Sequence, residues 1–270
     1  MKTRIISGVV FTALMALLFF FVPAIVTAIT MAVICVIASW ELLHTTGLVK
    51  NLWLNGCAAV MAVLVALWSY FGGRYAPMVL GILVYSALLF GHMLYTAGKT
   101  PLAEIGYCIF AGLVLPFLLS ALLRLRMMDH GRALLLIPFI MAYCSDTGAY
   151  FIGVFLGKHK MCPAISPKKS WEGFFGGIAV AVIVMLTYAL VLAQINRFYV
   201  NGWYAVIYGV VGALGSVFGD LMMSVVKRQV GIKDYGKLIP GHGGILDRFD
   251  SVLITAPMTE ALLLLIPMVV

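Results

Sequence analysis

The residues best suited to chemistry lie in one segment, Lys233–Asp250. Gly243 and Gly244 leave the backbone bare, so its N–H groups can come close to a ligand. Asp247 and Asp250 follow, three residues apart, at the start of an apolar stretch. Mg²⁺ typically takes one or two carboxylates and leaves its other positions to water and phosphate oxygens. The segment therefore predicts a site for a phosphate compound and a divalent cation, with both acids as candidate metal ligands.

Two further residues of this segment carry functional groups. No Cys or His stands at zinc-ligand spacing from His242, so a zinc site is poorly supported. We interpret His242 as a residue of the substrate loop that orders it by hydrogen bonding, rather than as a catalyst. Arg248 lies between the two acids and suits phosphate oxygens.

A polar stripe precedes the segment. Ser216, Asp220, Ser224 and Lys227 follow helical spacing along one side of an otherwise apolar helix, and Arg228 extends the basic end. If the stripe held only serines, hydrogen bonding between packed helices would be enough to explain it. An acid among the hydroxyls and a basic pair at the end favour a functional polar cleft instead.

A second acid shares this pattern. Tyr143, Asp146 and Tyr150 fall at helical spacing in another apolar segment. Charged residues inside a membrane usually face the interior of the bundle or a water-filled cavity. Asp146 is therefore either a second wall of the same cleft or a structural acid, and we assign it to substrate binding.

The remaining acids carry less information. Glu41, Glu104 and Asp129 lie at the ends of apolar segments or in loops, where we expect solvated interfacial charges. Glu260 lies within an apolar stretch, and its role stays open between function and structure.

The loop 157–173 also carries cations. Lys168 and Lys169 lie between Ser166 and Ser170, and a helix follows. A basic run beside a membrane helix is most often an orientation signal or a contact for anionic headgroups. Here Ser170 can cap the following helix, whose free N–H groups can meet an anion.

The elements that position these residues follow from composition. Hydrophobic residues make up 63% of the 270-residue chain, charged residues only 10%, and the mean hydropathy is +1.09. Soluble domains carry about 25% charged residues. Too few charges remain to cover a globule, so the chain is an integral membrane protein, and disorder, secretion and a disulfide scaffold are excluded.

The apolar runs predict an all-α, polytopic transmembrane bundle with a polar cleft open to the cytoplasm. Spanning the hydrocarbon core takes roughly 20 residues of helix, and lipid allows no unpaired backbone. Within one run, Gly209, Gly212 and Gly215 recur every three residues and predict a packing face. About nine spans are expected, near Ile5–Phe21, Ala24–Leu42, Leu52–Tyr70, Ala76–Tyr95, Leu102–Leu123, Ala133–Leu156, Phe174–Gln194, Trp203–Val226 and Phe249–Val270.

The cationic residues predict the orientation. With a cytoplasmic N-terminus, thirteen of the eighteen Lys and Arg residues fall inside, and five fall outside: Arg74, Arg124, Arg126, Arg132 and Arg197. The positive-inside rule therefore favours a protein of the cell membrane with its N-terminus and active site on the cytoplasmic side. Most inner charges lie late in the chain, so we expect a multi-span scaffold over 1–132 and catalytic helices over 133–270, with loops 157–173 and 227–250.

Several motifs of this sequence together resemble the conserved pattern of a known protein family. Ser224–Arg228, Lys233-Asp234 and Ile239–Asp250 fall within 27 residues of mixed type, and Ser166–Ser170 and Ser145-Asp146 lie upstream. This pattern resembles that of the phosphatidate cytidylyltransferases, also called CDP-diacylglycerol synthases. The resemblance covers roughly residues 140–255.

The resemblance implies that CMP is transferred from CTP to phosphatidate, giving CDP-diacylglycerol and pyrophosphate in phospholipid biosynthesis. It implies Mg²⁺ on Asp220 and Asp247, with a second cation beside it as an option. It makes Asp220, Asp247, Lys227 and Arg248 the expected catalytic residues. The nucleotide and phosphate site would be lined by Ser224, Lys227, Arg228, Lys233 and Arg248, helped by Lys168, Lys169 and Ser170.

Two other functions would use similar features. A CTP-dependent lipid kinase would share the nucleotide and the membrane setting but transfer the γ-phosphoryl group. An ion-coupled secondary transporter also carries intramembrane acids, but its site would lie near the midplane, often between inverted repeats, and this sequence shows no repeat. No nucleic-acid partner is expected, and a homodimer is compatible with the sequence.

Overall fold

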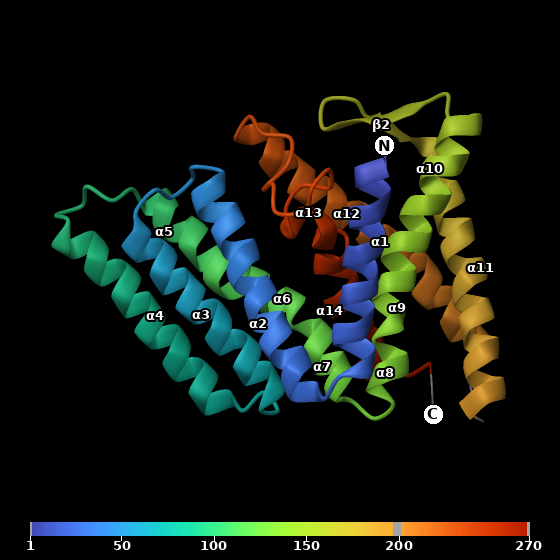
Figure 1. Ribbon diagram of the computed structural model, residues 1–270, viewed down its shortest axis with the longest axis horizontal. Coiled ribbons are helices and arrows are strands. Elements are labelled where there is room, and N and C mark those ends of the chain that lie inside the picture. Colours follow the sequence, from blue (N-terminus) through green and yellow to red (C-terminus); the bar gives the residue numbers. More distant parts are fainter. Residues whose placement is uncertain (1, 197–200, 269–270) are drawn as a thin grey trace. The chain divides into compact units, whose positions relative to one another are not determined.

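The computed structural model describes residues 2–196 and 201–268. Helices make up most of this part of the chain, as the sequence predicts (Figure 1). One difference is a short antiparallel hairpin in the loop 157–173. Its strands pair Lys160 with Ser170 and Cys162 with Ser166, with an irregularity between these pairs. The all-α fold class is therefore confirmed, and the hairpin is a local feature of a loop between helices.

Short π-helical turns, marked η, interrupt several of the helices. In chain order, the helices are α1 (Lys2–Ala16), α2 (Ala24–Trp40), α3 (Leu52–Tyr70), α4 (Tyr75–Tyr95), α5 (Leu102–Ile109), α6 (Leu115–Leu119), α7 (Ala121–Met127), α8 (Gly131–Leu134), α9 (Leu136–Phe139), α10 (Ser145–Leu156), α11 (Trp171–Asn196), α12 (Gly202–Gln229), α13 (Leu246–Phe249) and α14 (Val252–Leu265). The π-helical turns are η1 (Leu17–Phe21), η2 (Glu41–Thr45), η3 (Phe110–Val114) and η4 (Ile140–Cys144), and the strands are β1 (Lys160–Cys162) and β2 (Ser166–Ser170).

Seven helical segments of the described chain are long and apolar enough to cross a membrane. They are Ala24–Thr45, Leu52–Tyr70, Tyr75–Tyr95, Leu102–Met127, Gly131–Leu156, Trp171–Gln194 and Gly202–Gln229. Two shorter apolar helices, Ser7–Phe21 and Val252–Leu265, occupy the first and last predicted spans. The polytopic membrane architecture is thus confirmed, whereas the count of nine spans stays a prediction. Arg197, one of the expected outer charges, lies outside the described residues.

The chain divides into two compact units by contact. The first joins the segment up to Asp129 with Val230–Phe249, and the second joins His130–Gln229 with the segment from Asp250 onward. The glycine-rich loop thus belongs with the N-terminal helices, although it follows α12 in sequence. The predicted division at residues 132 and 133 concerns role rather than contact, and it stays a prediction.

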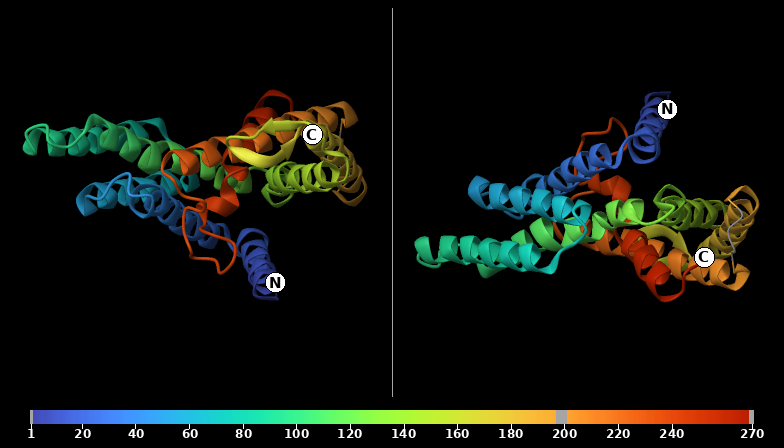
Figure 2. Two further views of the ribbon diagram at one scale, coloured as in Figure 1. Left: turned by 90° about the horizontal axis from the view of Figure 1, so that it is seen from above. Right: turned by 90° about the horizontal axis from the view of Figure 1, so that it is seen from below.

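The first unit is built around α2 and α3, which pack along their length. Asn51 caps α3, because its side-chain oxygen accepts hydrogen bonds from the backbone N–H groups of Trp53 (2.9 Å) and Leu54 (3.4 Å). Helix α4, teal in Figure 2, lies beside α3 at the edge of this unit. Few of its side chains are buried, so α4 presents most of its surface to its surroundings.

The second unit depends on close approach of α10, α11 and α12, which run side by side (Figure 1). A Cβ atom on Gly209 would lie 2.7 Å from the Cα atom of Val182 in α11, and one on Gly212 would meet the Met141 side chain. A Cβ atom on Gly215 would meet the Met258 side chain of α14. The packing face predicted from the three-residue spacing is confirmed.

Replacing Gly209 with Ala should therefore lower the free energy of unfolding by about 1–3 kcal/mol, because the added methyl group meets rigid backbone of α11. Thermal unfolding of the purified protein in detergent measures the change. Gly202→Ala is the matched control, since a Cβ atom there has no neighbour within 4 Å. Equal melting temperatures for both variants would show that α11 and α12 do not need this close contact.

Candidate active site

A polar pocket of about 350 Å³ lies in the second unit, among α10, α11, α12 and the hairpin. Asp146, Asp220 and Asp250 line it together with Lys168 and Lys169. Acids and cations that are far apart in sequence therefore share one pocket between apolar helices. This arrangement favours the interpretation of Asp146 as a second wall of the cleft that contains Asp220.

Asp220 and Asp146, the two helical acids that line this pocket, each have defined partners. The Asp220 carboxylate forms an ion pair with the Lys169 ammonium at 2.6 Å and accepts a hydrogen bond from the Ser224 hydroxyl at 3.4 Å. Asp146 accepts hydrogen bonds from Ser216 in α12 (3.0 Å) and from Ser251 (3.1 Å). The polar stripe of α12 thus serves both acids, with Ser216 reaching Asp146 and Ser224 reaching Asp220.

Asp250 is placed by a close backbone approach. A Cβ atom on Gly219 would lie 2.6 Å from the Asp250 carbonyl oxygen, so a glycine is needed for this segment to reach α12. Asp250 interacts electrostatically with Asp220 and Asp146, which repel it, and with the Lys227 ammonium, which attracts it. Three carboxylates and two buried or half-buried lysines therefore balance one another in and around this pocket.

The pocket suits a cation that is shared with a substrate. Within the described residues, no three His, Cys, Asp or Glu side chains are grouped to hold a metal ion by themselves. Mg²⁺ does not need such a group, because it keeps water and phosphate ligands beside one or two carboxylates. Asp220 and Asp250 can supply these carboxylates. The Lys169 ammonium already forms an ion pair with Asp220, so this carboxylate is placed to bind a positive charge. The residues thus fit Mg²⁺ that arrives with a phosphate compound.

The first unit contains the glycine-rich loop, which forms a separate pocket of about 400 Å³. Lys233, Lys237, His242 and Arg248 line this pocket. The chain turns back on itself where the Ile239 N–H donates to the Gly243 carbonyl at 2.9 Å, and the φ angle of Gly243 is +82°, a conformation that favours glycine. The loop therefore presents cations and bare backbone on one surface, as the sequence predicts.

Asp247 orders this loop. It is buried, and one carboxylate oxygen accepts hydrogen bonds from the N–H groups of Tyr235 (2.8 Å) and Gly244 (2.9 Å). The predicted role of Asp247 as a metal ligand with Asp220 is untested, because the two acids belong to different units. Asp250, by contrast, shares a pocket with Asp220.

Glu41 orders the glycine-rich loop, and its role was not expected from the sequence. The expectation of a solvated interfacial charge is wrong, because Glu41 is only 4% exposed. Its two carboxylate oxygens accept hydrogen bonds from the N–H groups of Ile245 (3.0 Å) and Leu246 (2.8 Å), more than 200 residues away. It also packs so closely on Gly236 and Gly244 that neither position has room for a Cβ atom. One available signal was the position of this acid near the end of an apolar helix, where a polar partner is needed.

His242 has a similar ordering role. Its Nδ1 atom lies 3.0 Å from the Ser7 hydroxyl of α1, and Ser7 also donates to the Pro240 carbonyl at 2.8 Å. These contacts agree with the interpretation of His242 as a loop-ordering residue. They give His242 no contact with a reacting group.

The hairpin loop keeps its two basic and two hydroxyl residues near the pocket of the second unit. Ser170 accepts a hydrogen bond from the Gly173 N–H at 3.2 Å, so the predicted helix cap is confirmed. Ser170 is buried among glycines, whereas Lys168 is exposed and Lys169 reaches Asp220. Arg228 donates to the Ile165 carbonyl at 3.3 Å and so ties the hairpin to the end of α12.

These features define a class of protein. An acid-lined pocket among apolar helices and a cation-lined glycine loop are suited to phosphate chemistry at a membrane. Comparison with known proteins narrows the class: the profile described as "Cytidylyltransferase family" matches residues 2–266.

Curated relatives agree with this match. Phosphatidate cytidylyltransferase of Haemophilus influenzae is 31% identical over 95% of this chain and 96% of its own length. That of Staphylococcus epidermidis is 30% identical over 86% of this chain and 87% of its own. That of Mycobacterium bovis is 36% identical over 64% of this chain and 56% of its own. The chain belongs to the cytidylyltransferase family, and it is a nucleotidyltransferase.

Replacing Glu41 with Gln should destabilise the glycine-rich loop. The amide retains one acceptor oxygen and turns a donor toward a backbone N–H, and leaving such a buried group unpaired costs about 1–3 kcal/mol. We expect a lower melting temperature in detergent and a loss of CTP turnover. Glu104→Gln is the control, because Glu104 lies in α5, away from the residues that line the loop pocket. Wild-type stability and turnover in Glu41→Gln would show that the loop keeps its shape without this carboxylate.

Proposed function

We propose that this protein transfers CMP from CTP to phosphatidate, giving CDP-diacylglycerol and pyrophosphate. Relatives named phosphatidate cytidylyltransferase match over most of the chain. The observation that carries the proposal at the level of residues is the pocket of the second unit, where Asp220 pairs with Lys169 beside Asp146 and Asp250. Such a pocket holds both the positive and the negative groups that two reacting phosphates require.

The two pockets suggest a division of substrates. The pocket of the second unit opens among apolar helices, and Tyr150 beside it is exposed. A phosphatidate headgroup can enter there while its acyl chains stay in lipid. The loop of the first unit offers Lys233, Lys237 and Arg248, which suit the triphosphate of CTP.

Asp220 and Asp250, with Asp247 as a third candidate, are the residues that we expect to hold Mg²⁺, and a second cation beside it remains part of the proposal. When bound, Mg²⁺ supplies positive charge against the substrate phosphates. Asp146 lines the same pocket and can share this role, and its two serine partners keep its carboxylate oriented. Lys169 can leave Asp220 and pair with a substrate phosphate, because its side chain already lines the pocket.

The reaction needs little acid–base chemistry. An anionic oxygen of the phosphatidate phosphate forms a bond to the α-phosphorus of CTP, and the bond from that phosphorus to the β-phosphate oxygen breaks, which releases pyrophosphate. Such transfers depend mostly on positioning and on electrostatic stabilisation. We assign Lys227, Arg228 and Arg248 to stabilisation of the departing pyrophosphate, and Ser224 to binding of the nucleotide phosphates.

We also propose nine membrane spans with the N-terminus and active site on the cytoplasmic side. The two short apolar helices, Ser7–Phe21 and Val252–Leu265, would supply the first and last spans. The excess of Lys and Arg on that side supports the orientation. A homodimer and the lack of a nucleic-acid partner stay predictions.

Radiolabelled CTP distinguishes this function from that of a lipid kinase. With phosphatidate and Mg²⁺, label on the α-phosphate should enter the lipid phase, and label on the γ-phosphate should leave as pyrophosphate. Asp220→Asn should lower the rate at least about a hundredfold, in line with the loss of one charged group at a transition state. Asp129→Asn, an exposed acid outside both pockets, should leave the rate unchanged.

Transfer of the γ-label to the lipid would instead establish a kinase. Near wild-type turnover by Asp220→Asn would remove this residue from the reaction. Chelation of divalent cations should abolish turnover, and added Mg²⁺ should restore it.

Cysteine labelling tests the orientation. In a background without the native cysteines, Lys99→Cys and Asp129→Cys place thiols at two exposed positions separated by one predicted span. A membrane-impermeant maleimide added to intact cells should label position 129 and spare position 99. The opposite pattern would invert the topology, and equal labelling would change the span count.

A further inference from the structure

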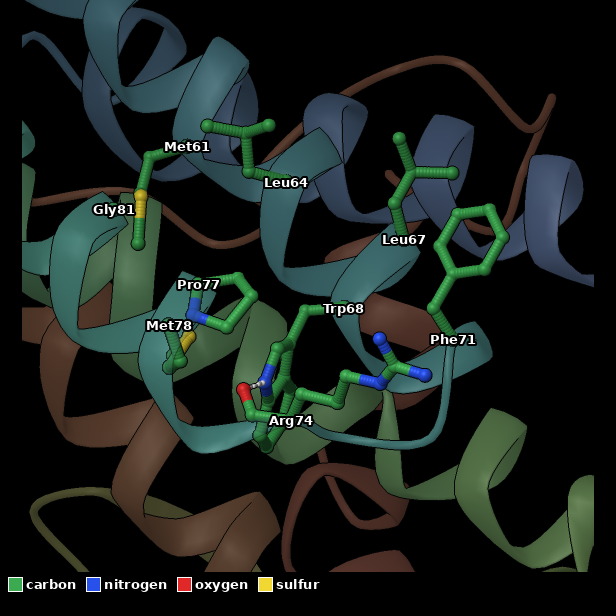
Figure 3. Close-up of a pocket in the computed structure, with 9 residues that line it drawn as sticks. All are labelled: Met61, Leu64, Leu67, Trp68, Phe71, Arg74, Pro77, Met78 and Gly81. Carbon is green, nitrogen blue, oxygen red and sulfur yellow. Dashed lines mark hydrogen bonds between the residues drawn. The ribbon is translucent and has the colours of Figure 1, made fainter.

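A groove of about 450 Å³ runs between α3 and α4 in the first unit, apart from both polar pockets. Met61, Leu64 and Trp68 line it from α3, and Met78 and Gly81 line it from α4 (Figure 3). These side chains are almost entirely apolar, and methionines adapt readily to an irregular ligand. The groove therefore fits a flexible hydrocarbon chain.

The position and length of the groove match one leaflet of a bilayer. Both helices are apolar enough to cross a membrane, so lipid is the surrounding solvent of their outer surfaces. The lining residues run along α3 from Met61 to Phe71, the residue just after the helix, which at about 1.5 Å per residue is about 15 Å. Half of a hydrocarbon core of about 30 Å has the same depth. One acyl chain of one leaflet can thus lie along the groove.

Helix α4 has few packing partners within the protein. Only 11% of its apolar stretch is buried within the protein, against 44% for α3 and 56% for Ala24–Thr45. A space between α3 and α4 that is too apolar for water would leave the side chains that line it without van der Waals partners on that side. An ordered lipid chain would supply these contacts.

A cation closes the end of the groove where the two helices meet. Arg74 is exposed, and among the residues that the structure describes its guanidinium takes part in no ion pair and no hydrogen bond. The Trp68 indole N–H donates to the Arg74 carbonyl at 2.8 Å, which holds the turn against the groove (Figure 3). Trp at this level and an unpaired Arg beside it are suited to the lipid headgroup region.

We propose that this groove binds one anionic phospholipid, with its phosphate at Arg74 and one acyl chain between α3 and α4. The charge of Arg74 selects an anionic headgroup over a zwitterionic one. The site is separate from the reaction, and the bound lipid acts as a packing element that holds α4 to α3.

Native mass spectrometry of the purified protein tests this proposal, with phosphatidylglycerol and phosphatidylcholine as probes. Wild type should retain phosphatidylglycerol about fivefold better than phosphatidylcholine, the preference that one interfacial cation confers. Arg74→Gln should remove the preference. Lys50→Gln, which removes an exposed cation outside the groove, should keep it.

A second pair of variants tests the groove itself. Gly81→Leu should fill it, since the nearest atom to an added Cβ is the Met61 methyl at 3.9 Å, and retention of both lipids should fall. Gly91→Leu, in the same helix with open space around its Cβ position, should bind lipid as wild type does. Addition of phosphatidylglycerol should raise the melting temperature of wild type and of Gly91→Leu, and it should leave that of Gly81→Leu unchanged.

Three results would overturn the proposal. Equal retention of both lipids by wild type, or an unchanged preference in Arg74→Gln, would show that Arg74 does not select the headgroup. A dimer that Gly81→Leu dissociates without any change in lipid retention would show that a second copy of the chain fills the groove instead.

Discussion

Charge in a low-dielectric environment is the constraint on which the arrangement of this protein depends. The chain has only ten acidic residues, and a charged side chain at the centre of a bilayer costs about 2.5–3.5 kcal/mol on insertion scales. Asp146 and Asp220 lie in apolar helices, and each has partners: two serines for Asp146, and Lys169 with Ser224 for Asp220. The partners come from other elements of the second unit as well as from α12, so compensation of these charges also fixes how α10, α12 and the hairpin meet.

The same constraint shapes the glycine-rich loop of the first unit. Its backbone N–H groups would be costly to bury alone, and two carboxylates accept them. Asp247 accepts from Tyr235 and Gly244, and Glu41 accepts from Ile245 and Leu246. The glycine-rich loop is thus ordered by two acids that accept hydrogen bonds from its backbone. Such preorganisation lowers the cost of orienting a charged substrate.

Close backbone contact between helices is the second requirement of the second unit. Gly209 and Gly219 bring α12 against Val182 and Asp250, and this approach carries Asp220 to the wall of the pocket. Small residues serve this purpose in membranes because lipid provides no hydrophobic drive between helices. Where such close contact is missing, as along part of the boundary between α3 and α4, a groove remains, and we propose that a lipid chain fills it.

The sequence by itself determined the membrane class, most of the helices, the packing face of α12 and the residue types of both pockets. These follow from local patterns: hydropathy, helical spacing, and Gly, Asp and Lys clusters within a few residues of one another. Only the tertiary structure decided the partners. Glu41 looked like an interfacial charge because its partners, Ile245 and Leu246, are more than 200 residues away. Likewise, Asp250 rather than Asp247 shares a pocket with Asp220, because the chain passes from one unit to the other between these acids and a three-residue spacing carries no sign of that crossing.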